Sequence, residues 1–185
     1  MTFDELRIRA DEASRRANEA YRRLERRYEG FSERERTRRV SRRRFSTLVD
    51  RTRRTGAPFG AHTIVSRSSG ELLLVRHEGV DRWVLPGGGV DRGESFLEAA
   101  RRELDEEAGI DARYEGLAMV TRVEIETGGY ETWGIIPTFA ATAESLEPEV
   151  SDPDGEISAA RWFETLPADT RDREELLAWR AENGV

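Results

Sequence analysis

The chain has 185 residues, of which 37% are hydrophobic and 36% are charged, and this length suits one good-sized domain or a compact domain with an accessory arm. The absence of cysteine excludes disulfides, thiolate metal sites and a cysteine nucleophile, and the two histidines, His62 and His77, cannot form a three-histidine zinc site. Any metal is therefore expected to be held mainly by oxygen, and the net charge of −7 argues against indiscriminate binding to nucleic acid.

Residues 1–55 differ in charge from the rest of the chain. They contain 18 arginines and 10 acidic residues, a net charge of +8, which leaves −15 for residues 56–185. The sequence contains no lysine, so a lysine nucleophile or Schiff base is excluded. The change in composition near Gly56 predicts an arginine-rich N-terminal arm over residues 1–55, followed by a separate domain over residues 56–185.

The apolar pattern of the arm predicts two helices. Steps of three and four residues place one narrow stripe on a long first helix, formed by Phe3, Leu6, Ala10, Ala13, Ala17, Ala20, Leu24 and Tyr28. Gly30 ends this helix, and Ser32 with Glu35 has the spacing of a capping box that opens a second helix. Arginines interleave with glutamates, which favours a solvated face with ion pairs over a nucleic-acid-binding surface. Because small alanines permit close helix packing, we expect a homodimer to which residues 1–55 contribute.

After Gly56 the period changes from helical to strand-like. Short apolar runs predict strands at 62–66, 72–75 and 82–85, a hairpin of 114–127 with 131–141 around Gly128-Gly129, and a further strand at 161–163. Gly134 and Pro137 are expected to interrupt the second strand of that hairpin. A helix is predicted over 95–108, opened by Ser95 with Glu98 and closed by Gly109, and another near the C-terminus.

The helix over 95–108 carries an acidic face directly behind a glycine-rich loop. Glu106 and Glu107 lie three and four residues after Glu103, so three carboxylates converge on one side of the helix. A solvated helix face is the ordinary explanation for such acids, but the glycines before them allow a ligand to approach the backbone closely. Clustered carboxylates suit Mg²⁺ or Mn²⁺, and these cations bridge to substrate phosphates.

The segment from Gly88 to Ile110 resembles the Nudix box. Gly88 is followed after five residues by Glu94 and after seven more by Arg102-Glu103-Leu104-Asp105-Glu106-Glu107-Ala108-Gly109-Ile110, with no departure from the family pattern. The resemblance implies an α/β fold, a Nudix-type α/β/α sandwich with a mixed sheet, here preceded by the N-terminal helical hairpin or arm. It also implies hydrolysis of a nucleoside diphosphate linked to another group X.

The resemblance also implies roles for individual residues. Glu103, Glu106 and Glu107 are the implied ligands of Mg²⁺ or Mn²⁺, with the Gly87 carbonyl as a further one, and Glu106 is also a candidate catalytic residue. Arg102 would orient the acidic cluster. Glu156 matches the glutamate that some relatives place before a late Arg-Trp strand, where it completes the site or acts as the base; a plain loop acid is the alternative.

Three residues are candidates for substrate binding. Arg76 ends a strand where relatives often place an arginine on the substrate phosphate, and a surface ion pair is the alternative. Trp83 and Trp133 are candidate walls for a nucleobase or the group X, and either is equally suited to the core. His77 is more typical of a polar loop residue than of a catalyst.

The substrate is expected to be a small nucleotide, and X remains open among nucleotide sugars, ADP-ribose-like compounds and nucleoside triphosphates. The alternative function is a nucleotide-sensing or RNA-associated binding module on the same fold, which the intact acidic cluster disfavours. The longest apolar runs are far shorter than the roughly 20 residues of a membrane span, and Met1 leads into no signal-peptide region. We therefore expect a cytoplasmic protein without a membrane segment.

Overall fold

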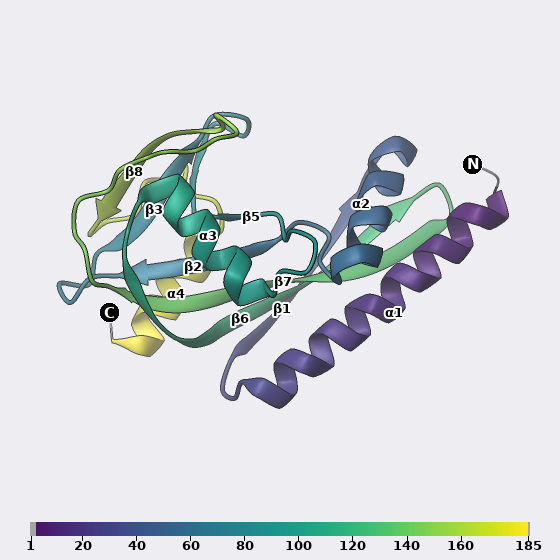
Figure 1. The fold of residues 1–185 in the computed structure, drawn as a ribbon, viewed down its shortest axis with the longest axis horizontal. Coiled ribbons are helices and arrows are strands. Elements are labelled where there is room, and N and C mark those ends of the chain that lie inside the picture. The colour runs from purple at the N-terminus through teal and green to yellow at the C-terminus, as the bar shows by residue number, and fades with distance from the viewer. Residues whose placement is uncertain (1–2, 185) are drawn as a thin grey trace. The chain divides into compact units, whose positions relative to one another are not determined.

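The computed structural model describes residues 3–184, which form two compact units (Figure 1). The first unit combines the described residues up to Ala61 with Gly88–Ala99 and Leu117–Thr138. The second combines His62–Gly87, Ala100–Gly116 and the described residues from Phe139 onward. The predicted division of the chain into an arm and a catalytic domain at Gly56 stays a prediction.

The first unit begins with the long helix α1, Phe3–Arg27. Six residues of its predicted stripe are buried within the chain itself: Leu6, Ala10, Ala13, Ala17, Ala20 and Leu24 are each at most 6% exposed. Tyr28 is half-buried, and the side chain of Phe3 lies outside the described part of the chain. Its first half packs against α2 and β6, and the Ala10 carbonyl accepts a hydrogen bond from the Thr132 hydroxyl at 3.0 Å. The alanine stripe therefore needs no second subunit to cover it, which removes one argument for the predicted homodimer.

Residues 32–39 form a strand, so the predicted second helix of the arm is wrong over this segment. Strand β1, Ser32–Arg39, pairs in parallel with β6, Ala112–Thr127, in a register from Ser32 opposite Met119 to Arg39 opposite Glu126. Cross-strand contacts support the register, since Arg39 Nε lies 3.2 Å from a Glu126 carboxylate oxygen. The arm is thus helix, strand, helix. Pairing with β6 overrides the helical propensity of the Glu and Arg residues.

The second helix of the arm begins later than predicted. Helix α2, Arg42–Thr55, has Ser41 as its N-cap, and its apolar face, Phe45, Leu48 and Val49, is buried against α1 and β6. Gly56 ends the helix with φ of 81°, a left-handed conformation that favours glycine. A Cβ at Gly56 would lie 2.6 Å from the Ala20 Cβ, so glycine also permits the close approach of α2 and α1.

The hairpin predicted around Gly128-Gly129 is confirmed, with β6 followed by β7, Tyr130–Ala143. The expected interruption of its second strand is wrong, because β7 continues through Gly134 and Pro137. Gly134 is required for packing: a Cβ there would lie 2.3 Å from the Pro58 ring. The chain segment after α2 therefore lies directly on β7 within the first unit.

The second unit is organised around β3, Leu72–His77. This strand pairs antiparallel with β2, Ala61–Ser66, with β4, Arg82–Val84, and with β8, Ile157–Phe163. Val65, Leu73 and Val75 pack against Leu104 and Ala108 of helix α3, Phe96–Ala108. Helix α4, Arg173–Asn183, buries Leu176 and Trp179.

The order of hydrogen-bonded strands is β1-β6-β7-β2-β3-β4, with β5, Gly87–Gly88, on β2 and β8 on β3. Because β1 is parallel to β6 and the partners of β3 are antiparallel, the sheet is mixed. The predicted mixed α/β fold with a helix at its N-terminus is therefore confirmed.

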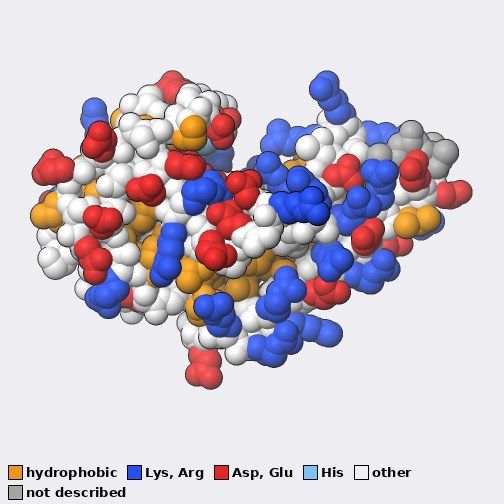
Figure 2. Space-filling view, viewed as in Figure 1, with side chains coloured by type: hydrophobic (Ala, Val, Ile, Leu, Met, Phe, Trp, Pro, Cys, Tyr) orange, Lys and Arg blue, Asp and Glu red, His pale blue; other side chains and the backbone are white. Residues whose placement is uncertain are grey.

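Arginine side chains crowd the surface of α1 and α2 (Figure 2). Several form the ion pairs that their interleaving with acidic residues predicted, including Arg9 with Asp50 at 3.2 Å and Arg53 with Glu12 at 3.4 Å, both between the two helices. Within residues 3–184, none of the helices has the length and apolar composition that a membrane span requires.

Candidate active site

Helix α3 begins with the capping box that the sequence predicted. The Ser95 hydroxyl accepts a hydrogen bond from the Glu98 N–H at 3.3 Å, and a Glu98 carboxylate oxygen accepts from the Ser95 N–H at 2.8 Å. The helix ends at Gly109, which has φ of 59° and donates its N–H to the Asp105 carbonyl at 2.8 Å. The capping box and Gly109 set where the helix begins and ends, and its residues between these points share faces according to the helical period.

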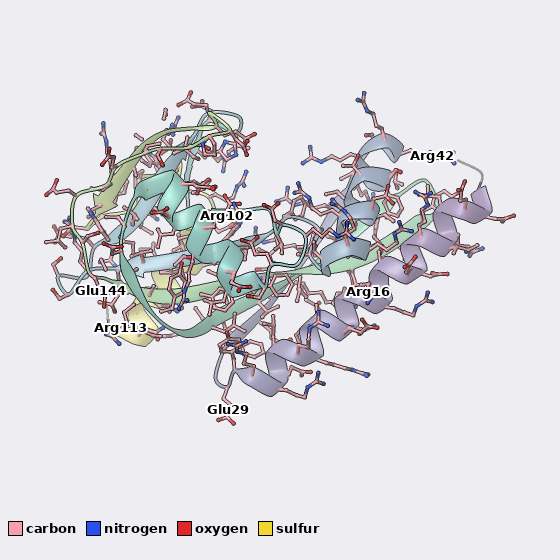
Figure 3. The ribbon with its side chains drawn as sticks, viewed as in Figure 1. Arg16, Glu29, Arg42, Arg102, Arg113 and Glu144 are labelled. Carbon is pink, nitrogen blue, oxygen red and sulfur yellow. The ribbon has the colours of Figure 1, made fainter. Side chains whose placement is uncertain are left out.

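Arg102, labelled in Figure 3, contacts two of the three clustered glutamates. Its Nη1 donates to Glu103 Oε1 at 2.8 Å and to Glu106 Oε2 at 3.1 Å. A single guanidinium therefore holds two carboxylates of the acidic face in place. The contacts are those expected of a residue that orients the cluster, and its catalytic role stays a prediction.

Glu107 is the most deeply buried of the three glutamates. Its side chain is buried, the residue being 8% exposed, and its Oε2 accepts a hydrogen bond from the Gly87 N–H at 2.8 Å. Burial raises the pKa of the Glu107 carboxyl to about 8, against the opposing effect of the Gly87 hydrogen bond. Repulsion from Glu103, Asp152 and Glu156 adds to the increase.

The donor set of this cluster fits a hard divalent cation. Within residues 3–184, no group of three or more Asp, Glu or His side chains surrounds a single metal position, and two of the three glutamates lie against Arg102. Glu107, however, is a buried carboxylate among other carboxylates, and a nearby cation would offset its cost of ionisation. Glu103, Glu106 and Glu107 would hold Mg²⁺ or Mn²⁺ once the first two turn from Arg102. The Gly87 carbonyl stays a predicted ligand.

Glu156 lies in the loop before β8, and its side chain is 65% exposed. The charge of Glu156 contributes to the raised pKa of Glu107, which indicates that the two carboxylates are near each other. The loop is tied to the end of α3, because the Ser151 N–H donates to the Glu106 carbonyl at 3.0 Å. The structure thus brings Glu156 toward the acidic helix, and its role as a base stays a prediction.

Two residues near Glu156 were not assigned a role from the sequence. Asp152 Oδ2 accepts hydrogen bonds from the Glu156 N–H at 2.6 Å and the Ile157 N–H at 2.8 Å. His77 Nε2 lies 3.5 Å from Glu156 Oε2. The Asp152-Pro-Asp-Gly turn is a signal that could have identified Asp152, whereas nothing local to His77 indicates its contact with a residue 79 positions later.

Arg76 and Trp83 lie together in the second unit. Arg76 pairs with Asp81 and Asp169, which is the ion-pair alternative considered for this residue. The guanidinium carbons of Arg76 and Arg161 each lie 5.9 Å from the centroid of the Trp83 ring. Contact with a substrate phosphate requires Arg76 to exchange at least one carboxylate partner, and both substrate roles stay predictions.

Trp133 belongs to the first unit, and the other candidate residues belong to the second. The Arg122 guanidinium stacks over its ring at 4.1 Å from the centroid, and the side chain is half-buried. Its assignment as a wall for a nucleobase or the group X stays a prediction.

Comparison with known proteins identifies the domain that carries this cluster. Residues 57–180 match the family model described as the NUDIX domain. Over 53 residues the chain is 53% identical to the putative 8-oxo-dGTP diphosphatase of Bacillus subtilis, a match that covers 29% of this chain and 36% of that protein. It is 39% identical over 59 residues to the RNA pyrophosphohydrolase of Psychrobacter cryohalolentis, which covers 32% of this chain and 34% of the relative.

Both curated matches span about a third of the relative's length. Among solved structures, the NUDIX domain of Shewanella oneidensis NrtR, in a cocrystal with ADP ribose, superimposes with a TM-score of 0.52 at 16% identity, covering 68% of this chain and 86% of that one. At this identity the likeness shows the fold alone.

Proposed function

The chain belongs to the NUDIX family, and we propose that it is a hydrolase that cleaves the pyrophosphate linkage of a nucleoside diphosphate joined to a further group. The observation that carries the proposal is the buried carboxylate of Glu107. It accepts a hydrogen bond from the glycine-rich loop and lies near Glu103, Asp152 and Glu156, and among residues 3–184 no arginine or histidine pairs with it. Burying one carboxylate near three others makes its ionisation unfavourable. A protein that used the fold only for binding would have no need of such a carboxylate.

The chemistry follows from the donors on α3. A bound Mg²⁺ or Mn²⁺ neutralises phosphate charge and makes an attacking water more acidic. Glu103, Glu106 and Glu107 would hold it after the first two exchange their contact with Arg102 for the cation, and until then Arg102 keeps both carboxylates beside each other. Glu156 is exposed and in a loop tied to α3, where it can accept the proton of the attacking water.

Recognition of the substrate rests on residues outside the acidic cluster. In this proposal Arg76 binds a phosphate oxygen, while Trp83 and Trp133 stack on planar groups. The relatives named above include proteins called a putative 8-oxo-dGTP diphosphatase and an RNA pyrophosphohydrolase, so nucleoside triphosphates and RNA belong among the tested substrates. Nucleotide sugars and ADP-ribose complete the set.

The test is turnover of these compounds with Mg²⁺. Nucleotide sugars and ADP-ribose are read as phosphate released after coupling to a phosphatase, and substrates with a free terminal phosphate are read by separating the products chromatographically. We expect hydrolysis of at least one compound, loss of turnover with Glu107→Gln, and near-normal turnover with Asp105→Asn. Asp105 is a matched control because it lies exposed on the same helix. Full activity of Glu107→Gln at saturating Mg²⁺ would contradict the metal assignment. No turnover on any compound, together with tight RNA binding, would favour the binding-module alternative.

The proposal also includes a cytoplasmic homodimer. The remaining support for the dimer is charge, since residues 1–55 carry +8 and the rest of the chain carries −15. The support for a cytoplasmic location is the cysteine-free composition, which suits a compartment where disulfides do not form.

A further inference from the structure

His77 is the last residue of β3, and an irregularity in the strand pairing sets its direction. The register between β3 and β8 shifts between Arg76 and His77, so that His77 is opposite Ile157. Such bulges change the direction of a side chain and occur often beside active sites. Here the shift brings His77 Nε2 to 3.5 Å from Glu156 Oε2.

A backbone contact determines which ring nitrogen of His77 carries the proton. The Gly79 N–H donates a hydrogen bond to His77 Nδ1 at 3.2 Å. An accepting nitrogen of a neutral imidazole carries no proton, so the proton is on Nε2. Nε2, the nitrogen that then carries the proton, is the ring nitrogen that lies 3.5 Å from Glu156 Oε2.

The main chain of Glu156 is already held on both sides. Its N–H donates to Asp152 Oδ2 at 2.6 Å, and its carbonyl accepts from the Glu78 N–H at 2.9 Å. These contacts do not restrict rotation of the Glu156 side chain, which is 65% exposed. A donor beside the carboxylate restricts that rotation directly.

We propose that His77, as its Nε2–H tautomer, is a positioning residue that holds the Glu156 carboxylate in the orientation from which it accepts a proton. This inference rests on the proposed function, because Glu156 is the base of that proposal. His77 does not touch the substrate in this scheme. It reduces the number of side-chain conformations of Glu156 that are unproductive.

The first test needs no activity. Long-range ¹H–¹⁵N spectra of the full-length protein resolve the tautomers, because Nε2 is identified by its correlation with both ring C–H protons and its ¹⁵N chemical shift then shows whether it carries the proton. The chain has two histidines, and the signals absent from His77→Gln belong to His77. We expect the Nε2–H tautomer, and a shift of the His77 signals in Glu156→Gln while those of His62 stay constant. An Nδ1–H tautomer, or no response to Glu156→Gln, would overturn the proposal.

The second test separates positioning from a general structural role. His77→Phe keeps a ring without the donor, and His77→Gln retains an N–H donor. We expect His77→Phe to lower kcat by about 10- to 100-fold with little change in KM, and His77→Gln to recover most of the loss. In the Glu156→Gln background, His77→Phe should have no further effect, because the group that it positions is already absent.

These outcomes distinguish the two proposals. If the wild-type protein hydrolyses none of the compounds, the proposed function fails, and the spectra still decide whether His77 contacts Glu156. If the wild type is active and His77→Phe lowers kcat equally in both backgrounds, the positioning role is wrong and the proposed function stands. If His77→Phe raises KM and leaves kcat unchanged, the positioning role is also wrong and the proposed function stands.

Discussion

Glu107→Gln should stabilise the metal-free protein while it abolishes activity. The substituted side chain keeps an oxygen to accept the Gly87 N–H hydrogen bond, which is 2.8 Å long in the wild type. It removes a charge that is buried and surrounded by other carboxylates. The folded state no longer has to exclude or neutralise that charge, so its free energy relative to the unfolded chain falls.

The size of the effect follows from the pKa of Glu107, which is about 8 in the folded protein against an ordinary value of 4.5. Between pH 4.5 and about pH 8, the Glu107 carboxyl is ionised in the unfolded chain and protonated in the folded protein. The free energy of unfolding therefore decreases as pH rises, by about 1.4 kcal/mol per pH unit, and levels off above pH 8. At pH 7.5 the substitution can therefore raise the free energy of unfolding by at most about 4 kcal/mol. Because neighbouring side chains relax, we expect a gain of about 2 to 4 kcal/mol from the substitution.

The measurement is urea denaturation in EDTA, followed by tryptophan fluorescence, for the wild type and for Glu107→Gln between pH 5 and 8.5. The two proteins should have similar stability at pH 5 and diverge as pH rises, with the variant more stable. Asp105→Asn on the same helix serves as the control, with no divergence of this size expected. The variant should also lose activity by about a hundredfold or more, on the order of 3 kcal/mol in the barrier.

A pH-independent difference between the two proteins, or a variant less stable than the wild type at pH 7.5, would refute the reasoning. The first result would mean that Glu107 is ionised at ordinary pH in the folded state. The second would mean that its charge has a compensating partner.

Three further predictions concern the base, the arm and the assembly. Glu156→Gln should lower kcat more than it weakens Mg²⁺ binding, which kinetics and a metal titration measure together; an unchanged kcat would leave Glu156 as a plain loop residue. Gly56→Ala should lower the free energy of unfolding by about 1 to 3 kcal/mol in urea denaturation, because φ is 81° and the new Cβ would meet Ala20 at 2.6 Å. Light scattering of the full chain should give twice its 21.1 kDa mass, and a monomer would contradict the dimer.

The sequence alone determined α3 and its acidic face. Ser95 and Glu98 close the capping box, Gly109 ends the helix, and the spacing of Glu103, Glu106 and Glu107 depends only on the 3.6-residue period. The strands of the second unit could be predicted for a similar reason, because runs of β-branched and apolar residues between turn residues carry a local signal. Each of these features is decided by contacts within a few residues along the chain.

Tertiary structure decided what depends on distant contacts. The segment Ser32–Arg39 has the composition of a helix, and it becomes a strand because β6 offers a parallel partner 87 positions later. The direction in which the three glutamates point was also undetermined: Arg102 holds two of them, while burial near Gly87 raises the pKa of the third. The contact of His77 with Glu156 depends on a register shift between β3 and β8. Periodicity reports which face of an element is apolar, and only the packed chain determines which neighbour that face meets and how much water reaches a charge.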